Sequence, residues 1–279
     1  MHRLGARTRG LSAALLVAAL SAPVAAAPPV RGQDRGGSPP AARSGELLVS
    51  AAISLKEAME TLGPRFERAH PGVVLRCNFG GSGALQKQIE AGAPVDVFLS
   101  AADEPMNELE ARGLVDRSSR RVVARNLLVV AVPADSRLVI ERMSDLMGPS
   151  VRRVAIGSPR TVAAGQYAEA SLRAAGGWEA LRPRLVFGEN VRQVLDYVAR
   201  GEVEAGFVWA TDIRVRPGEV RPAFRVPPET YPPATCPAAV VAASGQKALG
   251  RAFIDMLVGP QAQAALARLG FQPPGGAVR

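Results

Sequence analysis

Histidine and cysteine, which supply most metal ligands and many catalytic groups, are scarce in this sequence. The 279 residues include two histidines and two cysteines, and the two cysteines, Cys77 and Cys236, are far apart. So few residues do not form a ligand cluster for a metal ion. Asp96 and Asp103 lie seven residues apart, which is not a recognised chelating pattern. The sequence therefore gives no support to a protein that binds a bare metal ion.

The scarcity of histidine also argues against an enzyme of the serine hydrolase class. Gly80-Gly81-Ser82-Gly83-Ala84 faintly resembles a nucleophile elbow but lacks the final glycine. A hydrolase needs a base, and His70 lies in the turn formed by residues 69–72, whose composition indicates a solvated side chain. We therefore expect no enzymatic activity.

Long apolar runs are missing beyond the N-terminus. Arg3, Arg7 and Arg9 precede an apolar run over residues 11–20, and small residues follow it, which predicts a signal peptide over residues 1–26. The run is too short to span a bilayer, and no later stretch approaches about 18 apolar residues. No cysteine lies near the expected cleavage site at Ala26, so a lipid anchor there is unsupported. We expect a periplasmic protein.

Charge is unevenly distributed along the chain. The formal net charge is +9, but residues 1–44 hold six arginines and one aspartate, which leaves +4 for the rest. Residues 27–44 are rich in proline and glycine, as linkers are. No block of five like charges occurs and aromatic residues make up 5% of the chain, so we expect no nucleic-acid partner.

The state of Cys77 and Cys236 is open at the level of sequence. An exported chain enters an oxidising compartment, which favours a disulfide. Two separately buried thiols are equally compatible, because sequence does not give the Cα distance that a disulfide requires.

From residue 46 onward, hydrophobic periodicity alternates between strands and helices. The first series predicts strands over 47–51, 73–79 and 95–100 and helices over 54–69, 82–90 and 104–112. A strand predicted over 127–132 could lead out of the lobe formed by this first series. The second series predicts strands over 153–156, 184–187 and 204–208, helices over 164–175 and 191–200, and a Pro-rich extended segment over 216–235. A last strand over 238–242 precedes helices over 246–257 and 261–268.

This order predicts an α/β fold of two lobes, each with a doubly wound, mostly parallel sheet. We expect lobe I to comprise residues 45–124 and 236–279, and lobe II to comprise residues 125–235. A hinge between the lobes would allow closure over a small solute in the cleft.

Two uncharged turns, residues 51–55 (AAISL) and 79–85 (FGGSGAL), each follow an apolar strand and begin a helix. A helix start exposes N–H groups without intrahelical partners, and the hydroxyls of Ser54 and Ser82 can join them as donors. Either serine alone is most simply an ordinary N-cap. Two such turns at the carboxyl ends of strands in one βαβ unit instead favour an anion site.

Two later helix starts offer further backbone donors, in residues 158–167 (SPRTVAAGQY) and 188–192 (GENVR). Ala164 and Gly165 have almost no side chain, so a ligand can approach the backbone closely. Asn190 is a plausible cap, which makes Val191 the first helical residue. Taken alone, both segments are best explained as normally capped helices.

The chain resembles the periplasmic molybdate-binding proteins of ABC importers, which are type II solute-binding proteins. The resemblance covers roughly residues 46–272 and rests on an ordered set of stretches: AAISLKEAM, FGGSGALQKQIEAGAPVDVFLSAAD, NLLVVAVP, AAGQYAEASL, ENVRQVL, GFVWATD, PAAVV and VGPQAQAALARLGF. It implies a two-lobe, hinge-closing protein. The same fold also serves in bacterial transcription regulators, but the expected signal peptide and the absence of a helix-turn-helix segment argue against that role.

The resemblance implies a ligand set in which molybdenum is held as an oxyanion by neutral donors. These are the hydroxyl and backbone of Ser54 and Ser82 and the N–H groups of Ala164 and Val191. The family's fifth ligand is usually a tyrosine hydroxyl, and here that position is Trp209. An indole N–H donates from a different place and cannot accept, so Trp209 is either a modified ligand or a packing residue at the hinge.

Ala163 is a second departure from the family pattern, because family members often carry proline there. The resemblance further implies no cofactor, molybdate or tungstate as the ligand, an ABC transporter permease as the partner, and a monomer. Sulfate, another tetrahedral oxyanion, is the alternative ligand.

Overall fold

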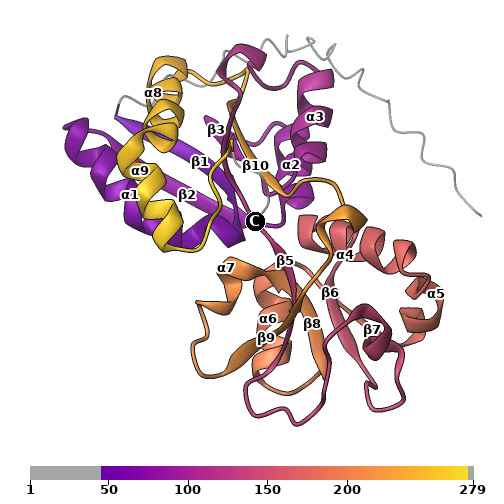
Figure 1. The fold of residues 1–279 in the computed structure, drawn as a ribbon. Coiled ribbons are helices and arrows are strands. Elements are labelled where there is room, and N and C mark those ends of the chain that lie inside the picture. Colours follow the sequence, from indigo (N-terminus) through magenta and orange to yellow (C-terminus); the bar gives the residue numbers. More distant parts are fainter. Residues whose placement is uncertain (1–44, 276–279) are drawn as a thin grey trace, which may run out of the picture. The chain divides into compact units, whose positions relative to one another are not determined.

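The computed structural model describes residues 45–275 as two five-stranded sheets flanked by helices (Figure 1). The expected signal peptide, residues 1–26, and the expected linker, residues 27–44, lie outside the described residues. Within the described part, no helix has the length and apolar character needed to cross a membrane.

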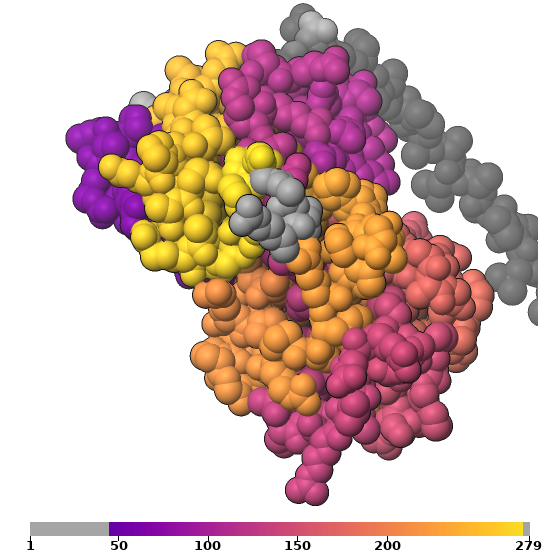
Figure 2. Space-filling view, in the orientation of Figure 1, coloured from indigo at the N-terminus to yellow at the C-terminus, as the bar shows by residue number. Residues whose placement is uncertain are grey.

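The first lobe is built on a sheet with the strand order β2-β1-β3-β10-β4. Its strands are β1 (Glu46–Ala52), β2 (Val74–Gly80), β3 (Val97–Leu99), β4 (Arg121–Arg125) and β10 (Thr235–Val240). Its helices are α1 (Lys56–Ala69), α2 (Ser82–Glu90), α3 (Asp103–Ala111), α8 (Lys247–Val258) and α9 (Pro260–Arg268). The C-terminal helices α8 and α9 pack beside α1, so both ends of the described chain complete this lobe (Figure 2).

The second lobe is built on a sheet with the strand order β7-β6-β8-β5-β9. Its strands are β5 (Leu128–Pro133), β6 (Val154–Gly157), β7 (Leu185–Gly188), β8 (Ala205–Trp209) and β9 (Val220–Arg225). Its helices are α4 (Ala163–Ala174), α5 (Trp178–Leu181), α6 (Val191–Ala199) and α7 (Ala210–Ile213).

Each sheet contains one strand that runs against the others. In the first sheet β1 is parallel to β2 and β3, and β10 is antiparallel to β3 and β4. In the second sheet β6 is parallel to β7 and β8, and β5 is antiparallel to β8 and β9. Both reversed strands follow a crossing from the other lobe. The predicted two-lobe α/β fold with mostly parallel sheets is confirmed.

Two elements of this fold are strands that the sequence pattern did not reveal. β4 is the edge strand beside β10, and β9 lies inside the segment predicted to be extended and Pro-rich. Both strands lie at sheet edges, where Pro222 of β9 is tolerated because an edge strand leaves some N–H groups unpaired. Edge strands lack the continuous apolar run of a buried parallel strand.

The chain crosses between the sheets twice, from β4 to β5 and from β9 to β10. The Asn126 N–H of the first crossing donates to the Ala234 carbonyl of the second at 2.8 Å. The Asn126 side chain also donates to the Thr211 hydroxyl at 2.9 Å. The crossings are thus bonded to each other and to the second lobe, as expected of a hinge.

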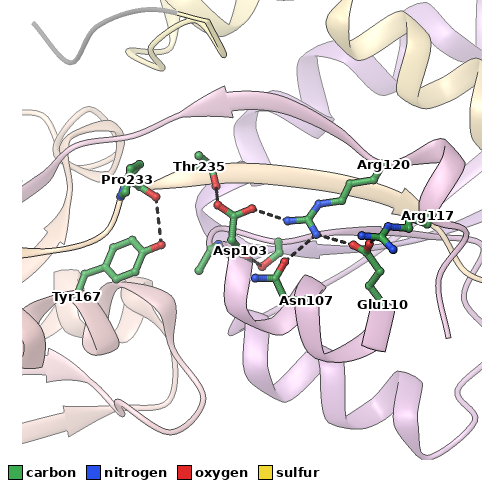
Figure 3. Close-up of polar contacts among 10 residues, drawn as sticks. Asp103, Asn107, Glu110, Arg117, Arg120, Tyr167, Pro233 and Thr235 are labelled. Carbon is green, nitrogen blue, oxygen red and sulfur yellow. Dashed lines mark hydrogen bonds and ion pairs between the residues drawn. The ribbon is translucent and has the colours of Figure 1, made fainter. Parts of the chain in front are cut away.

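The second crossing is held from both sides (Figure 3). The Tyr167 hydroxyl of α4 donates to the Pro233 carbonyl, and the Thr235 hydroxyl at the start of β10 donates to the Asp103 carboxylate of α3. Arg120 donates to the same carboxylate at 2.7 Å and is itself paired with Glu110. The hinge strand therefore enters the first lobe over a fixed polar network.

The two cysteines are free thiols. Cys77 is on β2 and Cys236 is on β10, and β1 and β3 separate these strands in the sheet. Three strand spacings amount to roughly 14 Å, far beyond the Cα separation that a disulfide allows. Of the two states left open by the sequence, separate thiols is the one observed.

Candidate functional site

A small cavity lies between the two lobes, at the carboxyl ends of β1, β2 and β8 and at the starts of α2, α4 and α6. Its volume is about 10 Å³. A cavity of this volume has no room for a sugar or a peptide. All five residues predicted as ligands line it: Ser54, Ser82, Ala164, Val191 and Trp209.

Neither serine caps its helix, which corrects the ordinary explanation for both. Ser54 lies in a 3-10 turn, Ile53–Leu55, between β1 and α1, and the N-cap of α1 is Leu55. Ser82 is the first residue of α2, and Gly81 is the N-cap. Both serines are buried, with 3% and 1% of their surfaces exposed. Their hydroxyls are thus not needed by their own helix starts.

The two hydroxyls are suited to donate a hydrogen bond into the cavity. Ser82 Oγ accepts the Ala101 N–H at 2.9 Å, which fixes the oxygen and leaves its hydrogen free to be donated. Ser54 Oγ is buried and has no hydrogen-bond partner among the residues that the structure describes. A buried hydroxyl in that condition costs free energy unless a ligand pairs with it.

The start of α4 provides backbone donors from the second lobe. Val162 is the N-cap, and its carbonyl accepts the N–H of Gly165 at 2.9 Å. The N–H groups of Ala163 and Ala164 precede that bond and have no intrahelical acceptor. Both residues line the cavity.

Gly165 serves packing rather than ligand approach, contrary to the expectation from sequence. A Cβ at this position would lie 2.0 Å from the carbonyl oxygen of Gly157, the last residue of β6. Gly165 does not line the cavity. The glycine therefore lets the first turn of α4 approach its own sheet.

The start of α6 matches the predicted cap. Asn190 Oδ1 accepts the N–H groups of Arg192 and Gln193 at 3.0 and 3.1 Å. The cap leaves the N–H of Val191, the first helical residue, without an intrahelical acceptor. Val191 lines the cavity, so this turn contributes one backbone donor.

Trp209, the last residue of β8, fits both alternatives left open by the sequence, because it lies at the cavity and also packs toward the hinge. It is 1% exposed and lines the cavity. Its ring also packs edge-on against Tyr167 at 5.6 Å, and Tyr167 stacks on Tyr231. Tyr231 accepts the Leu128 N–H at 3.3 Å, so the aromatic cluster extends to the hinge.

An ionic network borders the site without entering it. Arg192 of α6 donates to both carboxylate oxygens of Glu57 on α1, at 2.8 and 2.6 Å, and its Nε lies 3.0 Å from Asp212 Oδ1. The other oxygen of Asp212 accepts the backbone N–H of Trp209 at 3.0 Å. Sequence reasoning missed this network. Asp212 and Arg192 lie within GFVWATD and ENVRQVL, but nothing in either stretch indicates which partner each residue has.

Burial and pairing set the protonation of this network. Burial raises the pKa of Asp212 to about 6, although Arg192 and the Trp209 N–H act to lower it. Burial lowers the pKa of Arg192, but Asp212 and Glu57 outweigh it and leave that pKa above its ordinary value. The guanidinium is therefore charged and paired with two carboxylates. No charged side chain is among the described residues that line the cavity.

The groups needed for the alternative chemistries are not assembled. His70 Nδ1 lies 3.0 Å from the Phe66 carbonyl at the far end of α1, roughly 20 Å of helix away from the cavity. Asp96 accepts hydrogen bonds from the Leu48 N–H and the Ser244 hydroxyl, so its carboxylate joins segments of its own lobe. No group of three potential metal ligands occurs among residues 45–275.

Comparison with known proteins places this geometry among solute-binding proteins. Residues 47–272 match the family of bacterial extracellular solute-binding proteins. The molybdate-binding protein ModA of Escherichia coli (strain K12) is 34% identical over 235 residues, which cover 82% of this chain and 90% of that protein. An ABC transporter substrate-binding lipoprotein, so named in Bacillus subtilis (strain 168), is 36% identical over 61% of this chain and 64% of its own length.

A solved structure shows the same fold. The periplasmic molybdate-binding protein of Azotobacter vinelandii superposes with a TM-score of 0.73 at 27% identity, covering 82% of this chain and 99% of that one. These matches are to binding proteins and not to enzymes.

Proposed function

Because this chain belongs to the family of bacterial extracellular solute-binding proteins, we propose that it binds molybdate in the cavity between its lobes and delivers it to an ABC importer. The observation that carries the proposal is the convergence of Ser54, Ser82, Ala164, Val191 and Trp209 on one small cavity. The similarity to proteins named as molybdate-binding supports it. We propose lobe boundaries at the two crossings, with lobe I at residues 45–124 and 236–279 and lobe II at 125–235.

Neutral donors suit an oxyanion that carries no proton. Each hydrogen bond to a charged partner contributes about 1.5–3 kcal/mol, and a helix N-terminus adds about 0.3–1 kcal/mol. About five to seven such contacts yield a net 8–12 kcal/mol after association costs, which corresponds to micromolar to nanomolar affinity. No lysine or arginine ligand is needed, which agrees with the engagement of Arg192 by Glu57 and Asp212.

The same donors set selectivity. Phosphate that keeps a proton needs an acceptor, and a donor-only site leaves that proton unpaired at a cost of about 1–3 kcal/mol. Sulfate carries no proton at neutral pH and must be rejected by size, because its shorter bonds leave some donors stretched. Tungstate has nearly the size and charge of molybdate, so we propose that it binds as well.

The presence of Trp209 in the cavity is the reason to keep sulfate as a second candidate ligand. The larger indole occupies the position where the family usually has a tyrosine, so both the volume and the donor position differ. We propose that the indole N–H is the fifth donor, from a ring oriented by Tyr167 and a backbone held by Asp212.

The transport role implies further properties that we propose with it. Residues 1–26 act as a signal peptide, the protein works in the periplasm as a monomer, and its partner is an ABC transporter permease with its ATPase. The similarity to a lipoprotein of Bacillus subtilis fits a receptor that works outside the cytoplasmic membrane.

Isothermal titration calorimetry with molybdate, tungstate, sulfate and phosphate tests the function. We expect one-to-one binding of molybdate and tungstate with submicromolar dissociation constants and no measurable heat from phosphate. Equally tight sulfate binding would make this a sulfate receptor. The absence of binding to all four anions would refute the oxyanion proposal while leaving the fold unaffected.

A further inference from the structure

The contact between Glu57 and Arg192 joins the two lobes directly beside the cavity. Glu57 lies in the first turn of α1, three residues after Ser54, and Arg192 follows Val191 at the start of α6. The two side chains are 34% and 14% exposed, so water screens them only partly. Two parallel bonds at 2.8 and 2.6 Å give the pair a fixed geometry as well as attraction.

The two ion pairs of Arg192 depend differently on contact between the lobes. Arg192 also pairs with Asp212, which is fully buried and belongs to its own lobe. Glu57 belongs to the other lobe, and its carboxylate meets Arg192 only while the lobes are in contact. Separation of the lobes would therefore leave Arg192 neutralised by Asp212 and would release Glu57 into water, where a lone carboxylate is well solvated.

The network also reaches the positions that hold the ligand. Asp212 accepts the N–H of Trp209, Arg192 is adjacent to Val191, and Glu57 is on the helix that begins after Ser54. Contact between Glu57 and Arg192 thus brings the Ser54 and Val191 turns together, and Asp212 links the Trp209 backbone to the same network.

We propose that Glu57 and Arg192 form a latch that stabilises the closed arrangement of the lobes and thereby slows release of the bound anion. The proposal rests on the proposed function and names two positioning residues for it, neither of which touches the ligand. A latch of this kind acts after encounter, so it lowers the dissociation rate and leaves the association rate nearly unchanged.

The test compares Glu57→Gln with Glu60→Gln. Glu60 is one turn further along α1 and pairs with Lys56 of its own helix, so the control changes charge equally within the first lobe. We expect release of radiolabelled molybdate from the Glu57→Gln protein to be roughly threefold to tenfold faster, with little change in the Glu60→Gln protein. Arg192→Lys keeps a charge for Asp212 but loses the paired bonds, and it should add little to Glu57→Gln in the double variant.

Two further readouts separate a latch from a merely structural ion pair. The ligand-free melting temperatures of Glu57→Gln and Glu60→Gln should agree, because the pair stabilises closure rather than either lobe. We would measure the radius of gyration by small-angle X-ray scattering with and without molybdate. Under each condition in which the wild-type protein is closed, Glu57→Gln should have a larger radius than the wild type.

Equal release rates and equal radii in the two variants would overturn the latch. A lower ligand-free melting temperature in Glu57→Gln alone would also overturn it, because the pair would then belong to the fold itself. If the wild-type protein binds no molybdate, the proposed function fails, and the radii of the two variants still decide whether Glu57 holds the lobes together.

Discussion

Replacing Ser82 by alanine is expected to weaken molybdate binding by roughly tenfold to a hundredfold, because one hydrogen bond to a charged oxyanion is lost. The Ser82 oxygen also accepts the buried N–H of Ala101, so the variant should lose stability as well. An unpaired buried N–H costs about 1–3 kcal/mol. Titration calorimetry measures the affinity, and thermal unfolding without ligand measures the stability.

Two variants separate binding from folding in this experiment. Ser119→Ala is the control, because Ser119 is also buried in the first lobe and its hydroxyl accepts the Val240 N–H at 2.9 Å. Because the Ser119 hydroxyl also donates to the Asp116 carbonyl at 2.6 Å, this variant should lose at least as much stability and keep its affinity. Ser54→Ala should lose affinity and keep its stability, because Ser54 Oγ has no partner within the described residues. Unchanged affinity in both Ser82→Ala and Ser54→Ala would refute the assignment of the site.

Replacing Gly81 by alanine is expected to weaken binding by about a hundredfold or more. A Cβ on Gly81 would lie 2.6 Å from the carbonyl oxygen of Thr161 in the other lobe. The neighbouring Gly83 N–H donates to that same carbonyl at 3.0 Å, so the lobes meet here backbone to backbone. Holding them apart would stretch the donors of Ala164 and Val191, and two charge-assisted hydrogen bonds amount to about 3–6 kcal/mol.

The effect should arise from closure alone. Gly81 has φ −69° and ψ 140°, a conformation that alanine adopts without strain. Gly259 is the matched control, since it is also a helix N-cap, with φ −69° and ψ 156°, and its nearest neighbour, Met256 O, is in the same lobe. Calorimetry should show a loss of affinity for Gly81→Ala only, with equal ligand-free melting temperatures. Normal affinity in Gly81→Ala would show that binding does not need the observed contact between the lobes.

Local sequence pattern was enough to predict most elements and the ligand-bearing turns. Apolar residues at helical spacing place Met59, Leu62 and Phe66 in the buried face of α1, and Asn190 correctly indicated the start of α6. These signals arise from neighbours within a few residues, so they can be read from one sequence. The resemblance to a family then brought turns from both lobes into one hypothesis.

Features that depend on contacts between distant residues were not predictable. Glu57 and Arg192 are 135 residues apart, and neither has a local feature that reveals the other. The local sequence does not distinguish the roles of Gly81 and Gly165. Gly81 faces the other lobe, whereas Gly165 faces the sheet of its own lobe. Serine favours the N-cap position, yet Gly81 rather than Ser82 occupies it at the start of α2.

Anomalous diffraction at the molybdenum absorption edge, from crystals grown with molybdate, would locate the bound anion. We expect one strong peak in the cavity, with oxyanion oxygens within hydrogen-bond distance of the hydroxyls of Ser54 and Ser82 and the N–H groups of Ala164 and Val191. A peak elsewhere on the protein, or none under conditions in which calorimetry shows binding, would contradict this assignment of the site.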